Sequence, residues 1–119
     1  MIIFFLNFSA ESTLSGNIDF AGTDKHLNIV LFIQMNLNST KSMTGHLLGA
    51  AGVIETISCI LSIQHGIVPP TINHFTDDEN IDGRLDFTFN NAVKKDVKIA
   101  MSNTFGFGGH NACVLFKKL

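Results

Sequence analysis

The stretch NSTKSMTGHLLGAAG, residues 38–52, decides the fold because it opens a long and mostly apolar segment. Within that segment we predict a helix from Thr44 or Gly45 to about Gln64, with one stripe at helical spacing formed by Leu47, Ala51, Ile54, Ser58 and Leu61. Further apolar residues fill most of the remaining helix surface, which is typical of a helix buried inside a larger assembly. Gly66 follows as the C-terminal cap of the helix.

Small residues interrupt the beginning of this helix. Gly49 and Gly52 each lower helix stability by about 1 kcal/mol relative to alanine. Another interaction must offset this loss of stability, and we expect it to be the close approach of another backbone segment.

Strands are predicted on both sides of the helix, so the chain belongs to the α/β class. The polar residues 9–28 indicate a loop, and the residues after the helix indicate a long connection. The last two predicted strands enclose a glycine-rich turn and form a hairpin-like unit. The predicted strands are residues 1–8, 29–35, 85–89 (weak), 97–103 and 111–118.

The composition indicates one domain that belongs inside something larger. The chain has 119 residues, of which only 15% are charged, and a free-standing domain of this size normally carries more surface charge. The net charge of −2 argues against nucleic acid and anionic membranes as partners. The apolar start, residues 1–8, is too short to span a membrane and lacks the basic residues of a signal peptide. We therefore expect a soluble chain without a membrane span.

The cysteines and most histidines carry no recognisable site pattern. Cys59 and Cys113 fit neither a disulfide framework nor a metal motif, and both are predicted to be small buried residues in a reducing compartment. No metal site is expected, because ligand spacing is missing among the histidines His26, His65, His74 and His110.

His46 is the first candidate for chemistry. A lone histidine at the start of an apolar helix is more often structural than catalytic. The positive pole of a helix N-terminus disfavours a charged imidazole, however, so the ring would stay neutral and donate one N–H. A neutral donor of this kind suits the polarisation of a carbonyl or the stabilisation of an enolate.

Lys41 and Glu55 form the second candidate set. Lys41 is most simply a surface lysine, although a row of neighbouring hydroxyl groups could orient an inward-pointing ammonium group: Ser39, Thr40, Ser42 and Thr44. Glu55 is the only acid inside the apolar helix and needs a partner if it is buried. Lys41 is a candidate for that partner.

The third candidate is FGFGG, residues 105–109. Its glycines could simply turn a hairpin or form a bulge. Alternatively, they leave backbone N–H groups free to stabilise a developing oxyanion. The stretch is not a nucleotide-binding motif, and the chain contains no phosphate loop, so an unrelated nucleotide-binding α/β domain is a poor alternative.

Three segments together resemble the C-terminal part of β-ketoacyl-acyl-carrier-protein synthases, with the type II elongating enzymes of bacterial fatty-acid synthesis as the nearest likeness. They are residues 38–52, GIVPPTIN at 66–73 and SNTFGFGGHNA at 102–112, in the same order and at compatible spacing. The resemblance covers residues 36–119, whereas residues 1–35 look divergent or unrelated to the family. It implies a thiolase-like layered α-β-α-β-α fold, of which this chain holds part of the C-terminal half.

The resemblance also implies a reaction, the decarboxylative Claisen condensation of an acyl thioester with malonyl-acyl-carrier protein, and thus an acyltransferase of fatty-acid biosynthesis. His46 matches the second active-site histidine, which stabilises the enolate; Lys41 matches the lysine behind it, and Glu55 an acid in the same network. Phe105 matches the gating phenylalanine, whose N–H is expected in the oxyanion hole. The glycines of a mobile loop around Phe107 are then Gly106, Gly108 and Gly109.

Two family elements are missing. The nucleophilic cysteine belongs to the family's N-terminal half, and neither Cys59 nor Cys113 can replace it. The first active-site histidine has no match either, because FAGTD at 20–24 lacks it and His26 follows too late. We therefore expect the chain to be inactive alone, with a non-catalytic fragment or an accessory subunit docking on a complete enzyme as the alternative.

The remaining expectations also rest on the resemblance. Acyl-carrier protein bearing acyl and malonyl groups is the expected partner, and complete relatives form homodimers in the cytoplasm. Neither metal nor organic cofactor is expected, since the phosphopantetheine arrives on the carrier protein. The acyl chain-length preference depends on residues outside this segment.

Overall fold

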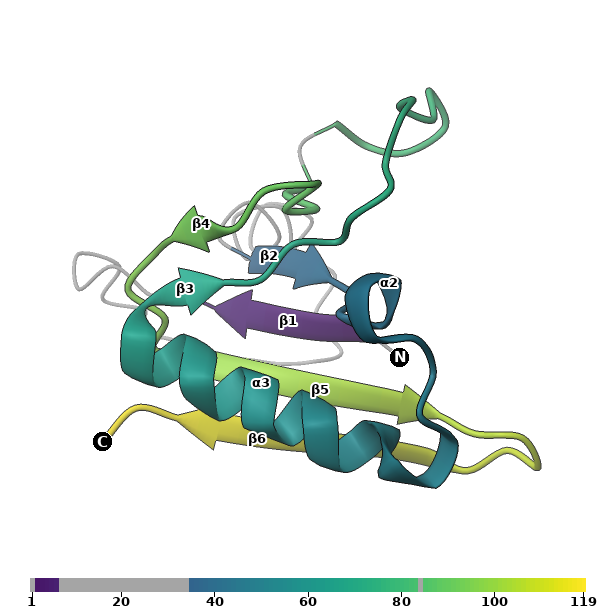
Figure 1. Cartoon of the computed structure of the whole chain (residues 1–119), viewed down its shortest axis with the longest axis vertical. Coiled ribbons are helices and arrows are strands. Elements are labelled where there is room, and N and C mark those ends of the chain that lie inside the picture. The colour runs from purple at the N-terminus through teal and green to yellow at the C-terminus, as the bar shows by residue number, and fades with distance from the viewer. Residues whose placement is uncertain (1, 7–34, 84) are drawn as a thin grey trace, which may run out of the picture.

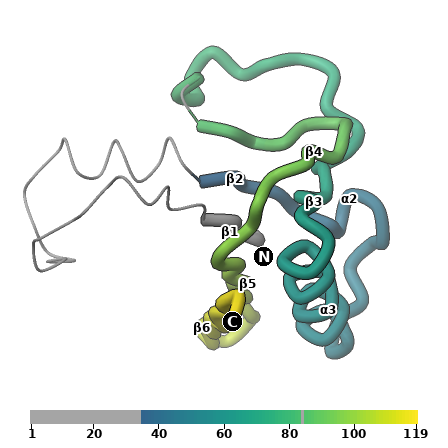
Figure 2. The backbone as a smooth tube through the Cα atoms, turned by 90° about the vertical axis from the view of Figure 1, so that its left-hand side faces the viewer, coloured from purple at the N-terminus to yellow at the C-terminus, as the bar shows by residue number. Residues whose placement is uncertain are grey.

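The computed structural model describes residues 2–6, 35–83 and 85–119, with side chains from residue 35 onward. Four strands form one antiparallel sheet in the order β2-β1-β5-β6, and the helix α3 lies across one face of it (Figures 1 and 2). Strand β1 confirms the strand predicted within residues 1–8. The strands of the sheet are β1 (Ile2–Leu6), β2 (Met35–Asn38), β5 (Ile99–Phe105) and β6 (Asn111–Lys117).

Strands β5 and β6 confirm the predicted hairpin. They pair in continuous antiparallel register from Ile99 opposite Lys117 to Phe105 opposite Asn111. The predicted strand at 97–103 begins and ends two residues later in the structure, at 99–105. The predicted loop at 9–28 lies outside the described residues, and of the predicted strand at 29–35 only Met35 is described, as the first residue of β2.

The helix predicted from residue 44 or 45 is interrupted, and this part of the prediction is wrong. One turn of helix, α2 (Lys41–Thr44), is followed by the 3₁₀ turn η1 (Leu48–Ala50) and then by α3 (Ala51–His65). Gly45, with φ 73° and ψ 176°, ends α2, because this conformation lies far from the helical region. Hydrophobic periodicity continues through the break and cannot reveal it.

The C-terminal end of α3 is as predicted. Gly66 adopts the left-handed conformation with φ 63°, and its N–H donates a hydrogen bond of 2.9 Å to the carbonyl of Ser62. A side chain at Gly66 would also approach the Lys95 carbonyl oxygen to 3.3 Å. Glycine is therefore needed at this position for both conformation and space.

The packed face of α3 differs from the predicted stripe. Its buried residues recur at helical spacing and are small or polar: Ala51, Glu55, Cys59 and Ser62. The core joins Cys59 to Val68, Val97 and Ala100, with Ala100 on β5. Only Ala51 belongs both to the predicted stripe and to this face. The prediction failed because ranking residues by apolarity favours the large side chains of the opposite face.

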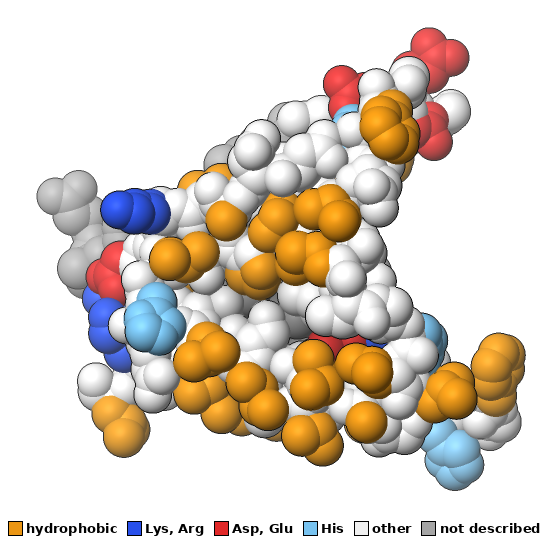
Figure 3. Space-filling model, in the orientation of Figure 1, with side chains coloured by type: hydrophobic (Ala, Val, Ile, Leu, Met, Phe, Trp, Pro, Cys, Tyr) orange, Lys and Arg blue, Asp and Glu red, His pale blue; other side chains and the backbone are white. Residues whose placement is uncertain are grey.

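Large apolar side chains of α3 remain exposed and gather along its outer surface (Figure 3). We call this surface the α3 outer face: Val53, Ile54, Ile57, Ile60 and Leu61, each at least 38% exposed. The start of the helix is equally uncovered, since a side chain at Gly49 or Gly52 would meet nothing within 4 Å. The close backbone approach expected at these glycines is therefore not made within the described residues.

The segment after α3 is held by single bridges rather than by a strand at 85–89. Two short strands, β3 (Ile67–Val68) and β4 (Val93–Lys94), pair with each other. Among the described residues between them, the chain makes two isolated parallel bridges, Asn36 with Asp86 and Thr71 with Phe89. Within the predicted strand, the Asp86 side chain accepts the backbone N–H of Thr88 at 3.1 Å, and this donor is thereby taken from a sheet ladder.

A buried asparagine ties this segment to the sheet. Asn36 is fully buried, and its Nδ2 donates to Asp86 Oδ2 at 2.5 Å and to Thr88 Oγ1 at 2.9 Å. Its Oδ1 accepts a hydrogen bond of 2.5 Å from Lys95 Nζ. All polar atoms of the Asn36 side chain are thus satisfied by residues 50 to 59 positions away.

Two expectations from composition need comment. Cys59 is buried as predicted, but Cys113 is exposed. Cys113 lies opposite Asn103, on the face of the hairpin that points away from the buried Ala100 and Ser102. The stretch Leu48–His65 has a mean hydropathy of 1.3 over 18 residues, so by length and composition it could cross a membrane, contrary to our reading of the sequence. The core helix of a soluble protein has the same length and composition.

Candidate active site

Lys41 and Glu55 meet in the structure, as the sequence suggested. Lys41 Nζ of α2 forms an ion pair with Glu55 Oε1 of α3, and the two side chains are 17% and 4% exposed. Ser102 of β5 donates a long hydrogen bond of 3.4 Å from Oγ to the other carboxylate oxygen. The buried carboxylate is therefore compensated by one charge and one hydroxyl group, as burial of an ionised acid requires.

Cys59 lies one helical turn beyond Glu55. Burial, reinforced by the nearby Glu55 carboxylate, raises the pKa of the Cys59 thiol from 9.0 to about 12. At neutral pH the thiol is protonated, and the thiol form is not the nucleophile. The structure therefore supports the expectation that Cys59 cannot act in place of a catalytic cysteine.

His46 lies between α2 and η1 rather than at the first turn of a long helix. It is exposed, and its Nδ1 accepts a hydrogen bond of 3.0 Å from the N–H of Leu48. An acceptor nitrogen carries no proton, so the neutral ring holds its proton on Nε2. The hydrogen bond from Leu48 therefore orients the ring locally, and the ring lies five residues before the N-terminus of α3.

The glycine-rich stretch 105–109 forms the turn between β5 and β6. Gly106 N–H donates a hydrogen bond of 2.7 Å to the carbonyl of His110, and Gly108 and Gly109 adopt φ values of 87° and 81°. Phe105 and Phe107 are exposed. The plainer interpretation, a hairpin turn, is therefore confirmed, and the Gly106 N–H is not free for an oxyanion in this conformation.

Figure 1 shows how these parts are arranged. The connection from α2 through η1 runs to the end of α3 that lies beside the β5–β6 turn. The connection between α2 and η1 and the β5–β6 turn therefore lie toward the same end of the molecule. Lys41, Glu55 and Ser102 meet between the helices and the sheet.

Sequence reasoning missed Ser102 and Leu48. Ser102 shares one face of β5 with the buried Ala100, and strand alternation around the apolar core would have placed its hydroxyl group toward the helix. Leu48 was missed because its φ of 51° is one that leucine rarely adopts and that no sequence pattern indicates.

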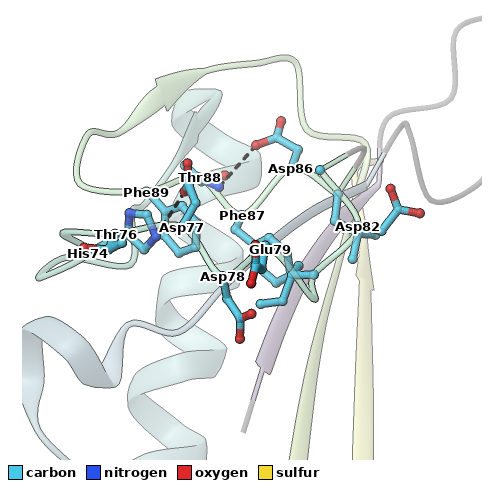
Figure 4. Close-up of a pocket in the computed structure, with 13 residues that line it drawn as sticks. His74, Thr76, Asp77, Asp78, Glu79, Asp82, Asp86, Phe87, Thr88 and Phe89 are labelled. Carbon is cyan, nitrogen blue, oxygen red and sulfur yellow. Dashed lines mark hydrogen bonds and ion pairs between the residues drawn. The ribbon is translucent and has the colours of Figure 1, made fainter.

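A separate cleft of about 560 Å³ lies among residues 74–89 (Figure 4). The His74 ring stacks on Phe89 at 3.7 Å between centroids, and His74 Nε2 lies 3.3 Å from Asp77 Oδ1. The acidic turn at 77–79 is exposed. Within the part of the chain described here, no group of three or more His, Cys, Asp or Glu side chains could hold a metal ion.

Comparison with known proteins identifies the family. Residues 26–75 match the family model described as "Beta-ketoacyl synthase, C-terminal domain". The chain is 42% identical to 3-oxoacyl-[acyl-carrier-protein] synthase 2 of Vibrio harveyi over 116 residues, which are 97% of this chain and 28% of that protein. It is 45% identical to the synthase 2 of Staphylococcus aureus (strain COL) over 114 residues, which are 96% of this chain and 27% of that protein.

Solved ketosynthase structures are also similar. The ishigamide ketosynthase/chain length factor aligns with a TM-score of 0.63 and 41% identity, covering 69% of this chain and 20% of that one. A type II polyketide ketosynthase in complex with its acyl-carrier protein, AntDE:AntF, aligns with the same TM-score and coverage at 36% identity. The fold is therefore part of the thiolase-like architecture of ketosynthases.

The chain spans about a quarter of the length of the curated relatives it matches. Both sequence alignments and the family match include residues from the segment 1–35. The predicted boundary between a divergent segment 1–35 and a family segment 36–119 stays a prediction. The motifs, the family match and the structural neighbours agree, so the chain belongs to the β-ketoacyl synthase family and corresponds to its C-terminal part.

Proposed function

We propose that this chain supplies the carbonyl-binding part of a 3-oxoacyl-[acyl-carrier-protein] synthase site, with His46 as the hydrogen-bond donor. One observation carries the proposal: the His46 ring is exposed, and the N–H of Leu48 occupies its Nδ1. Nε2–H is left to donate to an incoming oxygen. A neutral donor that is already oriented stabilises negative charge developing on a carbonyl oxygen.

The proposed reaction is a decarboxylative condensation. The malonyl thioester on the carrier protein loses carbon dioxide, and the electrons of the broken C–C bond form an enolate whose oxygen accepts a hydrogen bond from His46 Nε2–H. The enolate carbon then forms a C–C bond to the carbonyl of an acyl thioester, and the thiolate leaves. Phosphopantetheine on the carrier protein presents the malonyl group, and the proposal assigns no metal or organic cofactor to the chain itself.

Lys41 and Glu55 take a positioning role in this proposal. Their ion pair joins the two ends of the segment 42–54, which contains His46. Fixing both ends of this segment limits the positions that the His46 ring can adopt. The loop at 105–109 could then contribute the Phe105 N–H at the same end of the molecule.

A chimeric enzyme tests the proposal. The aligned quarter of the S. aureus synthase 2 is replaced by this chain, and both the decarboxylation of malonyl-carrier protein and the condensation are measured. We expect both activities to persist and His46→Ala to lower decarboxylation by about 10²–10³-fold, the usual effect of removing one oxyanion donor. His65→Ala, at the far end of α3, is the matched control and should leave the rate unchanged.

An active chimera in which His46→Ala has no effect would contradict this assignment. The nucleophile is expected outside this chain, because the Cys59 thiol is protonated at neutral pH and Cys113 lies in the edge strand. The isolated chain should therefore form no covalent acyl adduct with acyl-carrier protein. A stable adduct detected by mass spectrometry would show that the chain carries its own nucleophile.

The uncovered α3 outer face favours a second candidate, a non-catalytic accessory subunit that docks on a complete condensing enzyme. Exposed apolar surfaces of this kind commonly mark protein interfaces. Co-elution of the chain with intact S. aureus synthase 2, abolished by Ile57→Glu, would support it. Separate elution would leave the catalytic proposal as the only candidate. In either role we propose a cytoplasmic protein without a membrane span, and in the catalytic role a homodimer.

A further inference from the structure

Strand β6 is the open edge of the four-stranded sheet (Figure 1). The opposite edge is covered, because the Leu37 N–H of β2 donates a hydrogen bond of 2.8 Å to the Asp86 carbonyl. Within the described residues, no strand pairs with the outer side of β6. An edge strand of this kind presents a row of backbone N–H and C=O groups to which another strand can bond.

The register of the hairpin shows which of these groups point outward. At one end of the ladder Gly106 N–H bonds to the His110 carbonyl at 2.7 Å, and at the other end Lys118 N–H bonds to the Lys98 carbonyl at 2.9 Å. Hydrogen-bonded positions alternate in an antiparallel pair, so the even-numbered residues of β6 bond to β5. The backbone groups of the odd-numbered residues therefore point away from β5: Asn111, Cys113, Leu115 and Lys117.

The middle of β6 lacks the usual protections of an edge strand. Its register with β5 is continuous, so no bulge turns the edge away. Residues 112–116 are all apolar and contain no proline. Val114 and Leu115, on opposite faces of the strand, are 48% and 57% exposed. Positive charge is confined to one end, at Lys117 and Lys118, so the middle of the edge is open to pairing.

We propose that two copies of this chain pair through the outer edges of β6, antiparallel and centred on Val114. Outward-pointing groups must face each other, so odd-numbered residues pair with odd-numbered residues. Centring the pair on Val114 satisfies this condition and uses all seven residues of β6. Cys113 then lies opposite Leu115 of the second copy, and Asn111 lies opposite Lys117.

Charge and coverage select this arrangement. Parallel pairing in register would place Lys117 beside Lys117 of the second copy, and like charges side by side are destabilising. In the antiparallel pair the two Lys117 side chains lie at opposite ends, and apolar pairs fill the centre. A shift of the centre to Leu115 would leave Asn111 and its outward groups unpaired. Association stops at two copies, because the segment at Asp86 covers the other edge of each sheet.

Sedimentation and hydrogen exchange of the full chain over a range of protein concentrations test this inference. The Ile57→Lys variant serves as the background, so that association through the α3 outer face does not contribute. We expect the mass to double as the concentration rises, and the Cys113 and Leu115 amides to become protected from exchange at the same concentrations. The Phe116 amide, which bonds to β5, should be protected at every concentration.

Leu115→Pro in this background removes one outward N–H group. The hydrogen bonds to β5 should stay in place, because proline is tolerated where the N–H of an edge strand faces solvent. We therefore expect this variant to remain a single chain at concentrations at which the background chain pairs.

A charge exchange at the centre of the pair tests the register. Val114→Lys and Val114→Glu each place like charges opposite each other, so each variant alone should remain a single chain. An equimolar mixture places opposite charges there, and its mass should double. Val93→Lys makes the same exchange on β4, at a side chain that is 41% exposed, and should leave the pairing unchanged.

Three results would overturn the inference. The first is a background chain that stays single at all concentrations, and the second is pairing that leaves the Cys113 and Leu115 amides unprotected. The third is equal pairing of the two Val114 variants alone and mixed. A protected Phe116 amide shows that the hairpin of each variant is folded; if Leu115→Pro loses this protection, the charge exchange decides. The inference does not rest on the function proposed above, and the activity of the chimeric enzyme leaves it unaffected.

Discussion

Lys41 and Glu55 stand 14 positions apart in the sequence, and their side chains form an ion pair between α2 and α3. The pair spans the break at Gly45, where the helix predicted from the sequence is interrupted. It therefore holds together two helical pieces that no continuous backbone ladder joins.

Lys41→Met should destabilise the chain by about 3 kcal/mol, because it leaves the Glu55 carboxylate buried without a countercharge. Urea unfolding followed by circular dichroism measures the change. The double variant Lys41→Met/Glu55→Gln should recover part of the loss. Lys98→Met removes a partner of the exposed Asp96 and should leave the unfolding free energy almost unchanged. Equal losses for Lys41→Met and Lys98→Met would refute the burial argument.

Asn36→Ala should release the segment 85–95 from the sheet. The change leaves the groups that bind Asn36, on Asp86, Thr88 and Lys95, without this partner, at a cost of about 1–3 kcal/mol for each one that stays buried. Hydrogen exchange should report the release at the Leu37 amide, which bonds to the Asp86 carbonyl at 2.8 Å. Asn80→Ala, in the exposed acidic turn, is the control. Unchanged protection at Leu37 would contradict this account.

Cys59 should make stability fall at alkaline pH. Its pKa is 9.0 when unperturbed and about 12 in the folded chain, so the unfolded state loses its proton first as the pH rises. The stabilising contribution of Cys59 to the free energy of unfolding is fully present below pH 9.0. It is lost between pH 9.0 and about 12, at roughly 1.4 kcal/mol per pH unit. The free energy of unfolding is measured against pH for Cys59→Ala and for the original chain. The difference between the two curves separates the effect of Cys59 from the titration of the lysines. Identical slopes would contradict the prediction.

Gly52→Ala and Gly66→Ala should act in opposite directions. A side chain at Gly52 meets nothing within 4 Å, so alanine should stabilise α3 by up to about 1 kcal/mol. At Gly66, φ of 63° and the nearby Lys95 carbonyl should make alanine destabilising by about 1–2 kcal/mol. Thermal unfolding measures both. A stabilised Gly52→Ala chain that no longer complements the chimeric enzyme would show that another backbone approaches this glycine in the assembly.

The α3 outer face should make the isolated chain associate. Large apolar side chains exposed side by side favour association in water. Ile57→Lys should lower the apparent mass in sedimentation and reduce the binding of a hydrophobic dye, with little change in stability. The exchange of the buried Ala51 for lysine should unfold the chain instead. Monodisperse behaviour of the original chain at high concentration would count against this expectation.

The sequence predicted those parts of the fold that depend on local composition. Strands β5 and β6 and the end of the helix at Gly66 follow from residue type and spacing. Lys41 was a candidate partner for Glu55 by charge, and the tertiary structure brings the two together. The break at Gly45 and Leu48 was not predicted, because the apolar periodicity continues across a few non-helical residues. The packed face of α3 was missed for a different reason. It is built from Glu55, Cys59 and Ser62, and a buried charge is favourable only with a partner supplied by tertiary structure.

The turn between β5 and β6 has a consequence for a ligand that would accept a hydrogen bond from the Gly106 N–H. Because the Gly106 N–H is bonded to the His110 carbonyl, a substrate oxygen can use this group only in molecules whose turn has opened. The apparent affinity is then reduced by the fraction of open molecules. Substitutions that destabilise the closed turn would raise the apparent affinity for such a ligand without contacting it. Substitutions that stabilise the closed turn would lower the apparent affinity.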